Sequence, residues 1–242
     1  MEKQIITKNI GKKNLGKRNP YWCLYCSSYD RGLEHLLKMW PDVKKAVPQA
    51  ELHIFYGWQL FVRFYANNPA SMAWKEKMDK MMKADGITHH GRVSQPEIEK
   101  WYKKCGLWTY PTHFGEISCI SAMKAQAWGA IPVCVNYAAL KTTVQHGIKI
   151  EGDIYEPEVK EEYKKQLINL LKDHKRQEEI RKPMMKWGKD TFGWRKVAEK
   201  WSNEFKQDDL KEAMDVLLKK DKSLAKLLPV QMQKKYGHKI SY

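Results

Sequence analysis

The sequence is 242 residues long, and 43% of its residues are hydrophobic and 12% aromatic, which is typical of globular rather than disordered chains. A chain of this length can bury one sizeable core with an appendage. No apolar run approaches the roughly 20 residues that a membrane helix needs, and the N-terminal stretch has no signal-peptide core. Five cysteines in mixed spacing indicate a reducing compartment, so we expect a cytoplasmic protein.

The formal net charge of +16 has more than one interpretation. A surplus of this size attracts nucleic acid, anionic lipid or phosphorylated ligands. The lysines, however, are scattered along nearly every amphipathic segment, which favours solvated helix faces over a dedicated nucleic-acid surface. A peripheral contact with anionic membranes stays open, and nucleic-acid binding is the least favoured of these partners.

The first half of the chain alternates between short apolar runs and segments with helical periodicity. Residues 1–20, rich in lysine and glycine, predict a linker or tail. After them we expect strands at Tyr21–Cys26, Glu51–Tyr56, Ile87–His90 and Gly106–Tyr110, and helices at Leu33–Val47 and from Ser94, as N-cap, to Lys104.

Two pairs of residues in these strands invite a metal-site interpretation. Cys23 and Cys26 form a CxxC, but side chains three apart in a strand point to opposite faces, so buried structural thiols are expected. His89 and His90 are adjacent in a strand and also face opposite ways. No acidic ligand is near them in the sequence. We therefore predict no metal site.

The most informative stretch is Tyr110–Val135, YPTHFGEISCISAMKAQAWGAIPVCV. It predicts a strand, a loop, a helix over Ile117–Trp128 and a buried strand over Ile131–Val135, which together make a βαβ unit. The loop carries Glu116 to the start of the helix. Free amides and the positive end of the helix dipole favour anionic ligands there, so the stretch predicts a phosphate-facing loop with a carboxylate beside it.

The same stretch resembles the donor-binding core of retaining GT-B-fold glycosyltransferases of the family 4 type. The matching residues are Phe114-Gly115-Glu116, Cys119-Ile120-Ser121-Ala122-Met123, Ala125-Gln126-Ala127 and Gly129. Family members carry two glutamates separated by seven residues around this loop and helix. This chain has Glu116 at the first position and Lys124 at the second, so one acid of the pair is replaced by a base.

The resemblance implies roles for individual residues. Glu116 is expected to be catalytic and to orient the sugar, and Arg31 with Gly32 is expected to meet the donor diphosphate. Lys124 would reach the diphosphate or mark a domain that has lost catalysis. The expected donor-binding residues are Arg31, Gly32, Gly91, Arg92, His113, Phe114, Gly115, Ile117, Ser118, Cys119 and Lys124.

Simpler roles stay open for several of these residues. Glu116 would also stabilise a helix dipole, Ser118 would also serve as a plain N-cap, and Arg31 would also suit a surface turn. For His113, contact with ligand and exposure to solvent are equally compatible with the sequence.

The resemblance spans Tyr21–Phe205 and implies a three-layer α/β/α, Rossmann-like domain with a mostly parallel sheet, the C-terminal half of a GT-B fold. The N-terminal acceptor-binding domain of the family is not expected in this chain. Beyond the Arg195–Phe205 helix we expect a basic helical extension over residues 206–242. The expected domains are thus 1–20, 21–205 and 206–242.

The function implied is transfer of a sugar from a UDP-, GDP- or ADP-sugar donor, without a metal or other cofactor. The acceptor is a glycan, lipid or protein that the sequence does not specify, and a separate acceptor-binding chain is compatible with the resemblance. The alternatives are a catalytically inactive nucleotide-sugar-binding domain and, less favoured, a basic nucleic-acid-binding protein.

Overall fold

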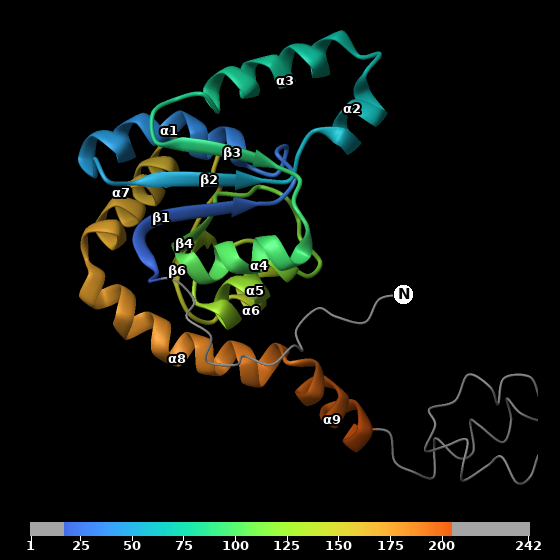
Figure 1. Ribbon diagram of the computed structural model, residues 1–242, viewed down its shortest axis with the longest axis vertical. Coiled ribbons are helices and arrows are strands. Elements are labelled where there is room, and N and C mark those ends of the chain that lie inside the picture. The colour runs from blue at the N-terminus through green and yellow to red at the C-terminus, as the bar shows by residue number, and fades with distance from the viewer. Residues whose placement is uncertain (1–16, 205–242) are drawn as a thin grey trace, which may run out of the picture. The chain divides into compact units, whose positions relative to one another are not determined.

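A computed structural model describes residues 17–204, and those up to Gly193 belong to one compact unit. Within it six strands form a single parallel sheet of order β3-β2-β1-β4-β5-β6 (Figure 1). The order reverses between β1 and β4, which in doubly wound sheets opens a crevice at the carboxyl ends of the strands. The strands are β1 (Asn19–Cys26), β2 (Glu51–Phe55), β3 (Ile87–Gly91), β4 (Cys105–Tyr110), β5 (Ile131–Val135) and β6 (Ile148–Ile150).

Helices cover both faces of the sheet and complete the expected three-layer α/β/α architecture (Figure 1). Helices α1 and α7 pack on one face, and α4, α5 and α8 pack on the other. In Figure 1, α2 and α3 extend away on the side of edge strand β3. The helices of this unit are α1 (Leu33–Ala46), α2 (Gln59–Tyr65), α3 (Pro69–Met81), α4 (Gln95–Lys104), α5 (Ile120–Trp128), α6 (Leu140–Thr143), α7 (Pro157–Lys172) and α8 (His174–Phe192).

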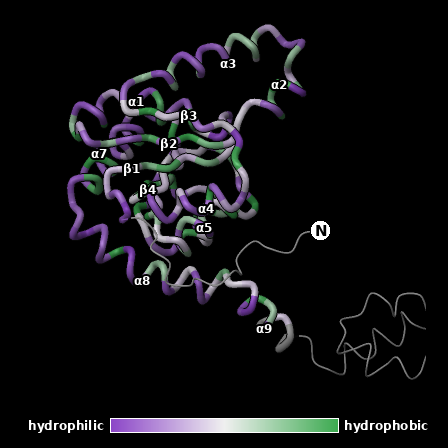
Figure 2. The backbone as a smooth tube through the Cα atoms, in the orientation of Figure 1, coloured by the Kyte–Doolittle hydropathy of each residue, from purple (hydrophilic) through white to green (hydrophobic). Residues whose placement is uncertain are grey.

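The central strands are apolar because both of their faces are covered. Every residue of β4 and β5 is buried, as expected for a parallel sheet enclosed by helices. Figure 2 shows this contrast, with hydrophobic colour along the strands and hydrophilic colour along the outer helix α8. The largest side chains of the core include Trp40 and Trp108.

The sequence placed most elements within a few residues. The strand Ile131–Val135 has the expected bounds, and α4 begins after Ser94 as expected, although the Ser94 side chain makes no capping hydrogen bond. The short apolar run Ile148–Ile150 forms the edge strand β6.

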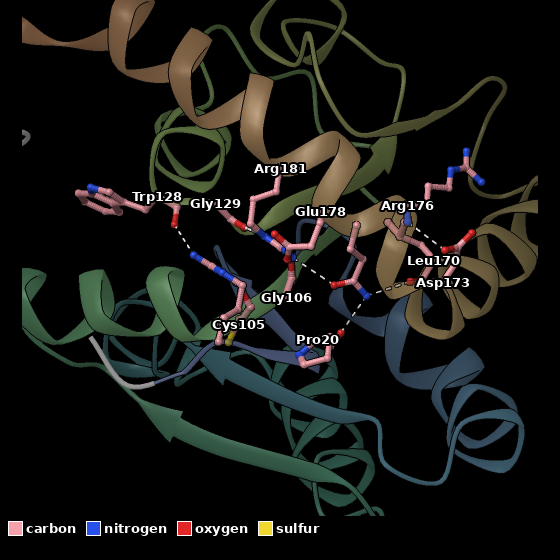
Figure 3. A network of polar contacts seen from close by, with 12 residues as sticks. Pro20, Cys105, Gly106, Trp128, Gly129, Leu170, Asp173, Arg176, Glu178 and Arg181 are labelled. Carbon is pink, nitrogen blue, oxygen red and sulfur yellow. Dashed lines mark hydrogen bonds and ion pairs between the residues drawn. The ribbon is translucent and has the colours of Figure 1, made fainter. Parts of the chain in front are cut away.

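At the amino-terminal edge of the sheet, two arginine side chains donate hydrogen bonds to backbone carbonyls of neighbouring elements; Figure 3 labels one of them, Arg181. Arg181 of α8 donates to the carbonyl oxygens of Gly129 at 2.9 Å and Gly106 at 3.3 Å. Arg18 donates to the carbonyl oxygen of Trp128 at 2.7 Å and also to that of Cys105. Carbonyls at the C-terminal end of α5 have no partner within the helix, so these two guanidinium groups satisfy them and tie α5 to β4 and α8.

A second unit begins at Trp194, and the structure describes it as far as Glu204, as helix α9 (Trp194–Glu204). Within α9, Glu199 forms ion pairs with Arg195 and Lys196. The predicted extension over 206–242 and most of the predicted tail lie outside the described residues, so these domain boundaries remain predictions. Of the helices described between residues 17 and 204, none is both long and apolar enough to cross a membrane.

Candidate active site

A cavity of about 300 Å³, the first cavity, opens at the carboxyl ends of β1 and β2 and extends to the N-terminal turns of α4 and α5. Gln95, Ile120 and Gln59, the first residues of α4, α5 and α2, all line it. Amides in the first turn of a helix have no partner within the helix and favour anions. Its lining residues include Cys26, Tyr56, Gly57, Arg92, Gln95, Tyr102, Ile120, Ser121 and Lys124.

The first turn of α5 is fastened to the end of β1. The Ser121 hydroxyl donates to the Cys26 carbonyl at 3.0 Å, and the Cys26 sulfur lies 2.7 Å from the Tyr102 hydroxyl. Burial raises the pKa of the Cys26 thiol, so it stays protonated at neutral pH. These contacts hold the mouth of α5 in place beside the first cavity.

Helix α5 begins at Ile120, so the predicted start at Ile117 is wrong. The backbone before Ile120 has other partners: the Glu116 amide donates to the Phe114 carbonyl at 2.9 Å, and the Glu116 carbonyl accepts from the Ala139 amide at 3.1 Å. The N-cap position belongs to Cys119 and not to Ser118, and its side chain makes no capping hydrogen bond. The Cys119 sulfur does face the amides of Ser121 and Ala122, but sulfur is a weak acceptor, so these amides remain open to a stronger one.

Glu116 and Arg31 form an ion pair beside this helix mouth. Arg31 Nη1 lies 3.3 Å from Glu116 Oε1, and the Arg31 guanidinium stacks on the Phe114 ring at 3.9 Å. The Glu116 side chain is 10% exposed and that of Arg31 is 34% exposed. The arginine therefore points at the loop that leads into α5, with part of its fork still open to solvent.

A tyrosine from β4 orients the Glu116 carboxylate. The Tyr110 hydroxyl donates to Glu116 Oε1 at 2.7 Å and also lies 3.1 Å from the Ser27 hydroxyl. Burial raises the pKa of Tyr110, so the hydroxyl keeps its proton and acts as a donor. Tyr163 of α7 in turn accepts from the Tyr110 amide at 3.0 Å and donates to the Val133 carbonyl at 2.6 Å, which fixes the end of β4.

Gly32 is required where the turn after β1 passes the loop after β4. Its φ is +105°, and a Cβ built there would lie 2.1 Å from the carbonyl oxygen of Pro111. No other residue type fits such a close backbone approach at that φ without strain. The glycine thus lets the turn that carries Arg31 lie against the loop that carries Glu116.

Lys124 lies inside the first cavity wall rather than near the Arg31 cluster. It is 8% exposed, and its ammonium donates to Gln95 Oε1 at 2.6 Å. Burial lowers the pKa of Lys124. The side chain therefore bridges α5 and α4 across the first cavity, an arrangement that spacing along the chain could not reveal.

The structure distributes the predicted site residues over three places. Arg92 and Lys124 line the first cavity, while Arg31, Phe114 and Glu116 form the neighbouring cluster. Gly32 and His113 line a second cavity described below. Of the remaining predicted residues, Ile117 is 97% exposed, Cys119 is 4% exposed, Ser118 and Gly115 are exposed, and Gly91 is half-buried at the end of β3.

Sequence reasoning missed Tyr110, Ser27, Cys26 and Gln95. Tyr110 and Cys26 end predicted strands, and residues at the carboxyl ends of parallel strands commonly face the ligand crevice, so a strand-end rule could have found them. Nothing in the sequence pairs Gln95 with Lys124. Within residues 17–204, no three histidine, cysteine or carboxylate side chains gather into a candidate metal site.

Solved structures with the same fold include an O-GlcNAc transferase and a glucosyltransferase domain. The pneumococcal O-GlcNAc transferase GtfA in complex with UDP and GlcNAc matches with a TM-score of 0.57 and 18% identity, over 78% of this chain and 36% of that chain. Anabaena Alr3699/HepE in complex with UDP-glucose matches with a TM-score of 0.58 and 13% identity, over 76% of this chain and 49% of that one. The catalytic domain of cholesterol-alpha-glucosyltransferase from Helicobacter pylori matches with a TM-score of 0.50 and 14% identity, over 70% of this chain and 98% of that domain.

These similarities confirm the Rossmann-like fold expected of a GT-B glycosyltransferase domain. The chain spans between a third and a half of the length of the GtfA and HepE structures. No curated protein sequence matches it significantly. The family model described as glycosyl transferases group 1 matches residues 8–187, most of the chain, and the protein therefore belongs to the glycosyl transferases group 1 family.

Proposed function

We propose that this chain is the donor-binding part of a retaining, metal-independent glycosyltransferase of the cytoplasm. The first cavity takes the nucleotide, and the diphosphate lies between the N-terminal amides of α5 and Arg31. The observation that carries the proposal is the Arg31–Glu116 ion pair at the mouth of α5. It joins a diphosphate-binding cation and a sugar-orienting carboxylate in one cluster.

The chemistry requires stabilisation of the charge that develops on the leaving diphosphate. Preorganised amides and a guanidinium supply it without reorganisation, and an arginine fork suits phosphate oxygens. Glu116, held by Tyr110, would accept hydrogen bonds from the hydroxyls of the donor sugar. Gly91, Gly115, Ile117, Ser118 and Cys119 retain their proposed donor contacts through backbone groups of the loops around this cluster.

A UDP-sugar is the donor that we favour over GDP- and ADP-sugars. GtfA is described in complex with UDP, and HepE with UDP-glucose. The transferred sugar and the acceptor are not specified by these similarities. An acceptor-binding domain, in this protein or in a separate chain, would be needed to complete the reaction.

The second candidate function is nucleotide-sugar binding without turnover. Lys124 favours it, because an ammonium only donates hydrogen bonds and stands where the family resemblance expects an acceptor for the ribose hydroxyls. Both candidate functions predict binding of the nucleotide sugar, but only the first predicts that the sugar is hydrolysed or transferred.

The test is calorimetric titration of the purified chain with UDP, GDP, ADP and their sugars, in the presence and absence of EDTA. We expect selectivity for one nucleotide, no effect of EDTA, and at least a tenfold loss of affinity in Arg31→Ala, as about 1.5–3 kcal/mol is typical for a lost charged hydrogen bond. Arg176→Ala, on the exposed face of α8, is the matched control. Equal affinity in Arg31→Ala and the wild type would contradict the proposal, and binding without hydrolysis or transfer would select the second candidate.

A further inference from the structure

A second cavity, with a volume of about 580 Å³ against about 300 Å³ for the first, lies between the start of α1, the α2–α3 segment and the loops after β4 and β6. Its size suits a ligand of one or two sugar rings within the usual range of binding pockets. Its aromatic lining residues are Tyr29, Phe61, Tyr65, Trp74 and Tyr155.

These rings form a connected but incompletely covered surface. Phe61 packs on Trp74 with centroids 5.3 Å apart and on Tyr65 at 4.9 Å. Helix α2 buries none of its residues, and Tyr65 and Tyr155 are 46% and 57% exposed. Exposed aromatic surface gathered around a hollow marks a binding site rather than a packing core. The flat C–H face of a pyranose ring packs well on such rings.

Polar groups that suit hydroxyls alternate with the rings. Nδ1 of His113 is buried and has no hydrogen-bond partner among the described residues. His35, whose ring packs on Tyr155 at 4.8 Å, has its pKa lowered to about 4 by burial and is neutral at physiological pH. A neutral imidazole both donates and accepts, which suits a sugar hydroxyl.

The charge of the cavity argues against a phosphate or nucleic acid. Its lining carries the carboxylates of Asp30 and Glu34 against the single ammonium of Lys38, although the chain as a whole has a net charge of +16. Glu34 accepts from the Trp74 indole at 2.8 Å and pairs with both Lys38 and Lys77 at 2.7 Å. Because these two ammonium groups are already paired with Glu34, the cavity offers no unpaired lysine to a phosphate, and a neutral ligand fits best.

The second cavity adjoins the Arg31–Glu116 cluster. Asp30 and Gly32, which line it, flank Arg31 in the chain, and His113 directly precedes Phe114, on which Arg31 stacks. A ligand in the second cavity would therefore lie next to the place proposed for the donor sugar.

We propose that the second cavity is a binding site for a neutral saccharide, and that it holds a sugar unit of a glycan acceptor next to the donor. The role as acceptor site rests on the proposed function, whereas saccharide binding itself does not.

The experiment measures saccharide and UDP binding separately in the full chain. Methyl glucoside, N-acetylglucosamine and maltose are tested by saturation-transfer-difference NMR and calorimetry, and UDP by calorimetry. Phe61→Ala and Tyr155→Ala remove rings of the second cavity. Phe64→Ala is the matched control, because Phe64 lies on the same helix, is 73% exposed and is not part of the lining.

We expect at least one neutral saccharide to bind and Phe61→Ala and Tyr155→Ala to weaken it by about tenfold, a change equal to ~1.4 kcal/mol, with UDP affinity unchanged. Phe64→Ala should bind like the wild type.

Absence of saccharide binding while UDP binds would overturn the proposed saccharide site but would not contradict the proposed donor site. Saccharide binding with this ring dependence but no UDP binding would support the site and overturn the proposed function. Choline binding with the same ring dependence and no saccharide binding would also overturn the inference.

Discussion

Glu116 receives both of its described side-chain contacts on one oxygen. Tyr110 donates to Oε1 at 2.7 Å and Arg31 lies 3.3 Å from the same atom, and no side chain within residues 17–204 donates a hydrogen bond to Oε2. The two contacts therefore hold the Glu116 carboxylate through Oε1 and leave Oε2 able to accept a hydrogen bond from a ligand hydroxyl.

Replacing Tyr110 by Phe should weaken binding of a UDP-sugar but not of UDP. The variant removes one hydrogen bond to the carboxylate, worth about 1–2 kcal/mol, or roughly five- to thirtyfold in affinity, while the contacts of the diphosphate stay in place. Calorimetry with both ligands measures the difference. Tyr137→Phe, on the exposed loop after β5, serves as the control, and an equal loss for UDP in Tyr110→Phe would contradict the orienting role.

At this scale the sequence could predict residues but not their pairing. Arg31 and Glu116 were expected in one site and do lie in contact. The Lys124 bond to Gln95 and the Tyr110 bond to Glu116 depend on which way side chains point from α4, α5 and β4. Hydrophobic periodicity carries no information on such contacts between polar groups.

At the scale of elements, the two ends of α5 are held in different ways. Its first turn lacks a side-chain capping bond and opens on the first cavity, whereas its last carbonyls are satisfied by Arg18 and Arg181 (Figure 3). The helix is thus anchored at the end distant from the first cavity and left open at the end that faces this cavity.

Replacing Arg181 by Met should destabilise the fold by about 3 kcal/mol, because it removes a buried guanidinium that donates to backbone carbonyls of two elements. Arg181 is 5% exposed and its bonds reach Gly129 and Gly106. Urea unfolding followed by circular dichroism gives the free energy of unfolding. Arg176→Met, exposed on the same helix and labelled in Figure 3, should change it by less than about 0.5 kcal/mol. Similar losses in the two variants would show that the buried contacts are unimportant.

Element bounds were predictable where apolar runs define them, as for β5 and β6, and failed where tertiary contacts compete with the helix. The start of α5 is the clearest case. The sequence Glu116-Ile117-Ser118-Cys119 suits a first helical turn, but the Glu116 carbonyl is bound by the Ala139 amide from the loop after β5. That partner lies on another element and could not be foreseen from local propensity.

At the scale of the whole molecule, buried histidines on both faces of the sheet make stability depend on pH. Burial lowers the pKa of His35 in α1 and of His53 in β2 to about 4. His53 packs against Trp101 of α4, and its Nδ1 lies 3.1 Å from His90 Nε2. Both rings are therefore neutral in the fold at physiological pH.

The free energy of unfolding should fall as the pH drops from about 6.5 to about 4. In this window the two histidines bind protons in the unfolded chain but stay neutral in the folded chain. Their contribution to the free energy of unfolding is therefore complete above pH 6.5 and is lost towards pH 4, by at most ~3 kcal/mol for each histidine. His53→Gln should flatten the pH profile between these values. Urea unfolding at pH 8, where the ring is neutral in both states, provides the reference, and a profile parallel to that of the wild type would exclude His53 as a cause.

The parallel sheet and its three layers were predictable, because alternating strands and helices leave few other topologies. The second cavity was not predictable, since its lining comes from α1, α2, α3 and two distant loops.

The contact between α5 and α8 has a consequence for substitutions far from either cavity. A Cβ at Gly188 would lie 2.8 Å from the amide nitrogen of Ala127, so α5 and α8 have no space for a side chain where they cross. Any side chain at this position would push the C-terminal end of α5 away from α8 and so shift the N-terminal end of α5, which carries Ser121. Substitutions at position 188 should therefore change the first cavity, which we propose binds the donor, as well as the local packing.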